Sequence, residues 1–262
     1  MKKLYFGAAL LFVGLTSCSS SDDSTNGNLT TFLPLTETSS WVYDVNLDAS
    51  EIGRDSLYVS GETTLNGKTY KQMKVKDVPA GFYTNSLNNN NVRVSGSKIL
   101  LSGSTGIALA DILPINIDVT DFIIFKEDAS NNAQLDAISG AITQDLQGIP
   151  IKIDYTLKST FKESLSSFTV PGKETYSNVK VVKLVANLKV GTEIEIPGTT
   201  ISLPFSILDS QDVIVSTHYY ADGVGMIYAK TAINYTLNDF SQAGFALPIP
   251  QEGDSTVEEF LN

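Results

Sequence analysis

Residues 151–158 read Ile-Lys-Ile-Asp-Tyr-Thr-Leu-Lys, so that every second side chain in this stretch is apolar. Successive side chains of a β-strand point to opposite faces, and this alternation is typical of a strand with one buried and one solvated face. The chain has 262 residues, which is long enough for one large domain with a sizeable core. Similar strand patterns recur along it, in 41–47, 56–64, 69–75, 179–190, 193–196, 201–207, 212–220 and 224–237.

Turn-forming residues separate several of these strands. Asn66-Gly67 is a strong hairpin signal, because both residues tolerate the positive φ that a tight turn requires. Ser95-Gly96-Ser97 and Ala221-Asp222-Gly223 join further pairs of apolar runs. The sequence therefore predicts an all-β fold: a single strongly curved antiparallel sheet, either a half-barrel or an open barrel, with little helix.

Two segments are less regular. Thr105–Phe125 is apolar but contains Pro114, which argues against one continuous helix, so we expect a strand or a wide connection across the inner face. In Ala129–Gln147 the apolar residues are spaced near the helical period, but Gly140 and the Ser and Thr content weaken this prediction. A helix and an extended strand both remain open for that segment.

Composition excludes several classes of function. The 18 basic against 29 acidic residues give a net charge of −11, which is the opposite of a nucleic-acid-binding footprint. The single cysteine excludes a disulfide scaffold. The chain has no glycine-rich phosphate loop and no calcium-binding loop pattern, so we expect neither a cofactor nor a metal.

The N-terminus has the layout of a secretory signal. Lys2 and Lys3 precede an apolar run over Leu4–Leu15, which is too short to span a bilayer as a permanent helix. Leu15-Thr16-Ser17-Cys18 resembles a bacterial lipobox, which implies cleavage after residue 17 and acylation of Cys18. We therefore expect residues 1–17 to be a lipoprotein signal peptide and the acyl chains to hold the protein on a membrane.

The expected domain organisation follows from this start. Residues 18–31 are rich in Ser, Asp and Asn and are typical of a flexible acidic tether. This tether also resembles the signal of Bacteroidota lipoproteins that face outward, so we expect an outer-membrane protein, with either surface or periplasmic exposure left open. Residues 32–250 are expected to form the β domain, and residues 251–262 an acidic, frayed C-terminal tail.

Candidate catalytic residues are few. His218, the single histidine, lies in a strand whose face also carries Ser216, Tyr220 and Asp222, and we interpret it as a structural or surface residue. A glycoside hydrolase needs two carboxylic acids that face the same sugar. The two pairs of carboxylates that are close in sequence are Glu193 with Glu195 and Asp118 with Asp121. The first pair alternates with isoleucines like a solvated strand face. We therefore expect the protein not to be an enzyme.

Three short motifs resemble the Asp-Ser/Thr acceptor of Bacteroidota O-glycosylation. They place candidate acceptor hydroxyls at Ser24, Ser56 and Ser255. The first and last of these fall in the polar terminal segments, where a transferase would reach them.

The C-terminal half carries a further resemblance. Phe168–Val181 and Tyr219–Ile227, together with the opening Phe32-Leu33-Pro34-Leu35 and Trp41-Val42-Tyr43, resemble Bacteroidota lipoproteins of unknown function and LolA/LppX-like half-barrels. This resemblance implies one antiparallel sheet curled around an apolar concavity, which in LolA-like proteins holds lipid acyl chains. The apolar segment from Ile107 to Phe125 would be either the plug of this concavity or its lining, and a filled core is the alternative. The candidate lining residues are Ile107, Leu109, Ile112, Leu113, Ile115, Phe122 and Ile124.

The sequence leaves three functions open. The first is a non-catalytic, membrane-anchored envelope lipoprotein that binds an apolar ligand, such as a lipid, or a partner protein of the envelope. The second is a surface glycan-active enzyme or a glycan-binding protein. The third is a purely structural envelope component, for which a filled core in place of a concavity would suffice.

Overall fold

The computed structural model describes residues 30–109, 113–146, 148–195, 202–239 and 250–262. Within these ranges the chain forms one short helix, α1 (Phe82–Leu87), and twelve strands. The strands are β1 (Ser40–Leu47), β2 (Ser50–Leu65), β3 (Lys68–Val75), β4 (Asn91–Ser95), β5 (Lys98–Leu109), β6 (Leu113–Lys126), β7 (Gln134–Leu146), β8 (Ile149–Thr169), β9 (Thr175–Glu195), β10 (Ser202–Ala221), β11 (Gly225–Thr236) and β12 (Glu252–Leu261).

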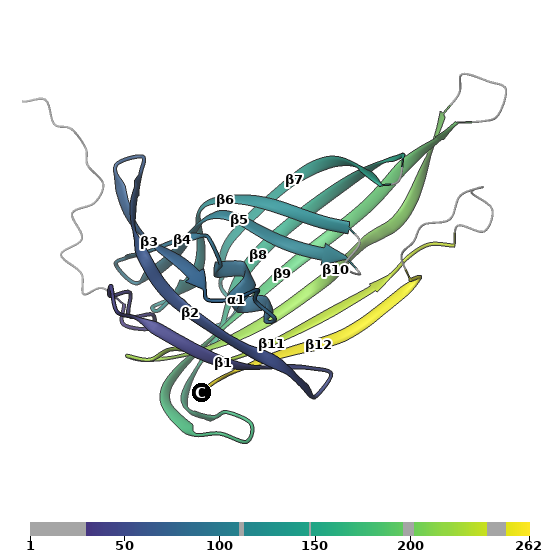
Figure 1. The fold of residues 1–262 in the computed structure, drawn as a ribbon. Helices are drawn as coiled ribbons and strands as arrows, with labels where there is room; N and C mark the ends of the chain where they lie inside the picture. The colour runs from purple at the N-terminus through teal and green to yellow at the C-terminus, as the bar shows by residue number, and fades with distance from the viewer. Residues whose placement is uncertain (1–29, 110–112, 147, 196–201, 240–249) are drawn as a thin grey trace, which may run out of the picture.

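All twelve strands belong to one antiparallel sheet, whose order is β6-β5-β4-β3-β2-β1-β12-β11-β10-β9-β8-β7. Strands that follow one another along the chain therefore lie side by side, and β12 returns to pair with β1. The sheet curls into a nearly closed barrel whose two free edges are β6 and β7 (Figure 1). This architecture confirms the predicted all-β fold with a single strongly curved antiparallel sheet and little helix.

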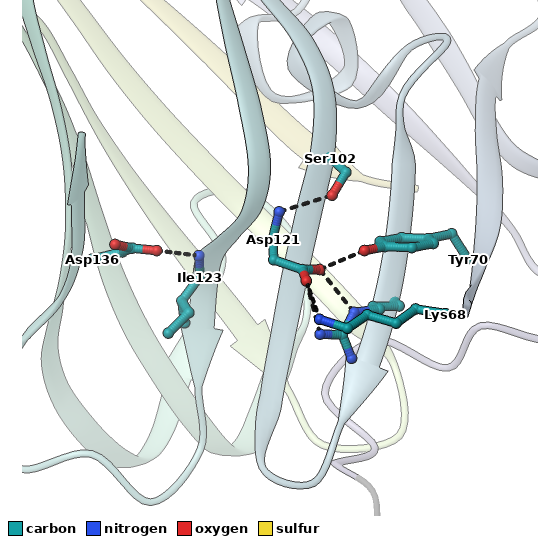
Figure 2. Close-up of polar contacts among 7 residues, drawn as sticks. Lys68, Tyr70, Ser102, Asp121, Ile123 and Asp136 are labelled. Atoms are coloured by element: carbon teal, nitrogen blue, oxygen red, sulfur yellow. Dashed lines mark hydrogen bonds and ion pairs between the residues drawn. The ribbon is translucent and has the colours of Figure 1, made fainter. Parts of the chain in front are cut away.

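The two edges meet through side chains at one point. Asp136 of β7 accepts a hydrogen bond from the Ile123 N–H of β6 at 3.0 Å (Figure 2). The hydroxyl of Ser159, on β8, donates to the Ile123 carbonyl at 2.6 Å. The described residues show no ladder of backbone hydrogen bonds between β6 and β7, so polar side chains satisfy the backbone where the barrel closes.

The segment that precedes β1 covers one end of the barrel. The Thr30 N–H donates to the Gly96 carbonyl at 3.0 Å, and the Gly223 N–H donates to the Thr31 carbonyl at 3.2 Å. Phe32 is completely buried, and its ring lies 5.2 Å from that of Phe125. Thr30 and Thr31 are thus bound to two turns on opposite sides of the barrel, and the expectation that the tether extends to residue 31 is wrong by two residues.

The C-terminal residues form a central strand. The prediction of a frayed acidic tail over residues 251–262 is wrong, because β12 pairs with β1 on one side and with β11 on the other. Its acidic residues suggested full exposure, yet Val257, Glu259 and Phe260 are buried. The β domain therefore extends to Leu261 and does not end at residue 250.

The two irregular segments resolve into strands. Ala129–Gln147 contains β7, so the extended alternative is the one observed, with residues of alternating exposure along the strand. Thr105–Phe125 contributes the end of β5 and most of β6, which pair as a hairpin across residues that include Pro114. Pro114 is exposed on the edge strand β6, a position where the missing N–H costs no ladder hydrogen bond.

Candidate functional site

The short helix α1 lies inside the curve of the sheet (Figure 1). Tyr83, Thr84 and Leu87 are buried, and Phe82 and Ser86 are half-buried. The sequence analysis did not predict this helix, since six residues are too few to show a helical period. Its position means that the barrel interior is partly filled by the connection between β3 and β4.

Two buried carboxylates hold the N-terminus of α1. Glu259 of β12 accepts hydrogen bonds from the backbone N–H groups of Tyr83 and Thr84, at 2.7 and 3.0 Å. Asp55 of β2 accepts one from the Gly81 N–H at 2.8 Å. The Thr84 hydroxyl hydrogen-bonds to both carboxylates. These contacts satisfy the N–H groups that have no partner at a helix start, and they fix α1 against β2 and β12.

The environment of Glu259 shifts its titration. The pKa of Glu259 is raised to about 7: burial is the largest cause, the hydrogen bonds from α1 oppose the shift, and the nearby Asp55 carboxylate adds to it. Glu259 is fully buried, and a Cβ placed on Gly81 would collide with its carboxylate. Glycine at position 81 is therefore what allows α1 to approach β12 this closely.

An apolar pocket separates α1 from the opposite wall of the barrel. Its cavity volume is about 30 Å³, so in this conformation it accommodates only a small group or molecule. The half-buried residues Phe82, Ser86 and Leu184 mark its solvent side. The other lining residues are buried: Tyr83, Leu87, Leu101, Thr105, Phe122, Ile124, Leu157, Ala186, Ile214, His218 and Tyr220.

Three polar atoms in the wall of this pocket have no hydrogen-bond partner among the described residues. They are the hydroxyl oxygens of Tyr83 and Tyr220 and Nδ1 of His218. The Tyr83 ring centre lies 5.1 Å from that of His218 and 6.3 Å from that of Tyr220, so the three rings form one cluster. All three atoms are completely buried within the wall, so the surface that the pocket presents is mainly apolar.

His218 is fixed in this cluster by its second nitrogen. Its Nε2 lies 2.8 Å from the Ser216 hydroxyl, which in turn lies 2.7 Å from the Thr231 hydroxyl. Burial lowers the pKa of His218 to about 3, which keeps the ring neutral at physiological pH. Ser216, His218 and Tyr220 are all buried on β10, as their predicted shared face implies, whereas Asp222 lies in the exposed turn after the strand. The histidine is buried at the pocket and does not lie on the surface.

The predicted lining of the concavity is reproduced in part. Phe122 and Ile124 line the pocket, whereas Ile115 is buried in the main core and is not among the lining residues. The side chains of the remaining four candidates, Ile107, Leu109, Ile112 and Leu113, lie outside the described part of the structure. Besides β5 and β6, the pocket is bounded by α1 and by strands β8 to β10, which the sequence analysis did not assign to it.

The candidate catalytic carboxylates have other surroundings. Asp121 accepts hydrogen bonds from Lys68 and Arg93, both at 2.8 Å, and from the Tyr70 hydroxyl at 2.6 Å (Figure 2). These donors, Arg93 first, hold the pKa of Asp121 far below its usual range. Asp118 is exposed on β6. In this pair, Asp121 therefore belongs to an ion-pair network that connects β6 to β3 and β4.

The remaining candidates are placed as follows. Glu193 is exposed on β9, and the side chain of Glu195 lies outside the described residues. Ser56 is half-buried in β2 and Ser255 is half-buried in β12, so Ser255 does not lie in a free terminal segment as the prediction assumed. Cys18 and Ser24 fall outside the described residues.

Comparison with known proteins gives no assignment. No family model, curated protein or solved structure matches this chain. None of the described helices has the length and apolar character needed to cross a membrane. Among the described residues, no three or more His, Cys, Asp or Glu side chains group together in a way that could hold a metal ion.

Sequence reasoning missed the central polar residues Asp55, Tyr83, Tyr220 and Glu259. Tyr220 shares the alternating face of His218, and this face was the one available signal. The sequence around Asp55 and Glu259 contains no such signal, because the roles of these two residues depend on the pairing of β1 with both β2 and β12. In that register Asp55 lies beside Tyr43, and Glu259 lies beside Val45.

Proposed function

We propose that this protein binds a small apolar ligand inside the barrel, in the pocket between α1 and β10. The observation that carries this proposal is the apolar lining of that pocket, to which α1 and strands on both sides of the barrel contribute hydrocarbon side chains. Burying the apolar surface of a ligand against such side chains contributes about 25 cal/mol per Å². An apolar pocket with a few convergent polar groups is the usual form of a small-molecule site.

The proposed location follows from the N-terminal sequence. An acylated Cys18 would hold the barrel at the outer membrane, so the protein would work as an anchored binding protein of the cell envelope. The likeness to LolA/LppX-like half-barrels supports binding in the concavity. Here α1 and several aromatic rings occupy much of the interior, so the ligand that we propose is smaller than a set of acyl chains.

Filling the pocket tests the proposal. Ala186, on β9, is buried in the pocket wall, and Ala186→Leu places a larger apolar side chain there. Ala141 is exposed on β7, so Ala141→Leu is a matched control with the same chemical change. Binding is followed by titration with benzene, a small neutral apolar probe, in two-dimensional NMR spectra, and by mass spectrometry of solvent extracts of the purified protein.

The expected result is at least a tenfold loss of probe affinity in Ala186→Leu and unchanged affinity in Ala141→Leu. Thr105→Leu fills the pocket from β5 and provides a second variant if Ala186→Leu does not fold. A wild-type protein that binds no probe and releases no apolar compound would contradict the proposal, as would equal binding in the folded pocket variants and the control.

A further inference from the structure

We infer that a hollow on the outer face of β7 to β10 binds a neutral compound with several hydroxyl groups, that is, a sugar. The hollow is separate from the interior pocket, so this inference does not depend on the function proposed above. Its volume is about 490 Å³, and small-molecule sites usually measure about 300–1,000 Å³. Its lining residues come from all four strands, so the strand pairing fixes their positions relative to one another.

A glycine in the middle of these strands leaves the hollow open. Ile151 and Ile153 are buried and point into the barrel, so Lys152, between them on β8, faces outward. Gly191 of β9 lies beside Lys152 on one side and beside Ser206 of β10 on the other. Because Gly191 has no side chain, the space between Lys152 and Ser206 is not filled.

The described rim of the hollow offers donors and acceptors of hydrogen bonds in balance. Lys152 and Asp154 form an ion pair at 3.0 Å, and Lys189 lies opposite Asp154 on the neighbouring strand. Glu193 follows two positions after Gly191 on β9, on the same face of the strand. The lining thus contains two ammonium groups and two carboxylates. A hydroxyl group both donates and accepts, so a ligand with several hydroxyls matches this rim.

The same balance disfavours ionic ligands. Asp209 lies beside the hollow, because it accepts a hydrogen bond from the Ser206 hydroxyl at 2.6 Å. An anion would approach this carboxylate together with Asp154 and Glu193, and a cation would approach the two lysines. Either ion would meet like charges as well as opposite ones, whereas a neutral ligand meets no such repulsion.

Two proline rings give the hollow an apolar side. Pro150 of β8 and Pro204 of β10 both belong to the lining and are exposed, and Pro204 lies beside Glu193 in the strand pairing. A sugar ring has C–H groups on its faces and hydroxyls around its edge, so its faces can pack on the prolines while its hydroxyls reach the charged rim. Because the charged groups stay in contact with water, each contributes little, and we expect dissociation constants in the millimolar range.

The test is a titration of the purified protein, followed in two-dimensional NMR spectra. The probes are the neutral methyl α-glycosides of glucose, galactose and mannose. Triglycine serves as a zwitterion for comparison, and glycerol as a polyol without a ring. We expect at least one glycoside to shift the amide resonances of Lys152 and Gly191 in a saturable manner, and we expect triglycine and glycerol not to do so.

Variants of exposed residues locate the binding. Thr143→Trp places a large ring in the hollow from β7 and should weaken glycoside binding at least fivefold. Ser139→Trp, at an exposed position of β7 that is not among the described lining residues, is the matched control and should leave the affinity unchanged. Lys152→Ala with Asp154→Ala removes the ion pair of the rim and replaces Thr143→Trp if that variant does not fold.

Three results would overturn the inference. The first is that none of the glycosides shifts the resonances of the hollow. The second is equal affinity in the folded hollow variants and in Ser139→Trp. The third is binding of triglycine or glycerol as tight as that of the glycosides, because the hollow would then not distinguish a sugar from other polar solutes.

Discussion

Asp121 shows how one residue connects three strands. Its backbone has φ of +52°, a value that Asn and Asp tolerate better than most other residues. Its carboxylate accepts from Lys68, Tyr70 and Arg93, and the Arg93 side chain is only 11% exposed. Because the guanidinium has little access to water, it depends on this carboxylate for a partner.

We therefore predict that Asp121→Asn lowers the free energy of unfolding by about 2 kcal/mol, because it removes the charge without changing the turn geometry. Asp121→Ala should cost more, since alanine tolerates the positive φ less well. Asp118→Asn is the exposed control on the same strand. Urea denaturation measures all three variants, and an unchanged midpoint in Asp121→Asn would show that the network contributes nothing to stability.

Glu259 and His218 give opposite pH dependences. The folded-state pKa of Glu259, about 7, lies above its ordinary value of 4.5, so this residue's contribution to stability decreases as pH rises from 4.5 through 7. The folded-state pKa of His218, about 3, lies below its ordinary value of 6.5, so its contribution to stability decreases as pH falls below 6.5. The two contributions oppose each other between pH 5 and 6.5.

Single variants should separate these contributions. In Glu259→Gln only the histidine remains, and we predict a loss of roughly 2 kcal/mol in unfolding free energy between pH 6.5 and 5. In His218→Gln the stability should instead rise on acidification from pH 8 to 5, by roughly 3 kcal/mol. Urea unfolding at pH 5, 6.5 and 8 measures both. Parallel pH profiles in the two variants would rule out this assignment.

At the scale of elements, α1 depends on its close approach to β12. Gly81→Ala would place a Cβ against the Glu259 carboxylate, so either the helix or the strand must move. We predict a loss of about 2 kcal/mol in stability together with altered ligand affinity, because α1 forms one side of the pocket. Gly106→Ala is a suitable control, since its Cβ would lie at an ordinary 3.6 Å from Asn116. Thermal unfolding and probe titration measure both variants. If the position of α1 did not matter for stability or binding, the two variants would have the same unfolding temperature and the same probe affinity.

The edge contact between β6 and β7 yields a second prediction at this scale. Ser159→Ala removes the donor to the Ile123 carbonyl at a completely buried position, and we expect a loss of about 1 kcal/mol. Amide hydrogen exchange at Ile123 should become faster, because local opening at the free edges becomes easier. Ser139→Ala, which removes an exposed hydroxyl contact with Thr156, should leave exchange at Ile123 unchanged.

The sequence predicted the positions of the strands better than it predicted which side chains are buried and what they contact. Alternation and turn residues located most strands, because side-chain period and turn chemistry are local properties. The helix α1, the burial of Glu259 and the closure of β12 onto β1 depend on contacts between residues far apart in the chain. Residues 251–262 illustrate the limit: their acidic composition indicated exposure, whereas pairing on both sides makes them a central strand.

At the scale of the whole molecule, β12 joins the two halves of the sheet. Strands β1 to β6 form one continuous half and β7 to β11 the other, and β12 lies between β1 and β11. We predict that deletion of residues 252–262 abolishes cooperative unfolding, because it removes Glu259 from α1 and exposes two further strand edges. Thermal unfolding followed by circular dichroism measures this loss. A truncated protein with a single sharp transition would contradict the prediction, and deletion of Asn262 alone is the control.

The place of β12 also has a consequence for biosynthesis. A polypeptide is made from its N-terminus, so the first strand cannot pair with the last one until synthesis is nearly complete. Until then the nascent chain has unpaired strand edges that favour association with other chains. Closure of the sheet is therefore a post-translational event, and a chaperone that shields β1 during synthesis would raise the yield of folded protein.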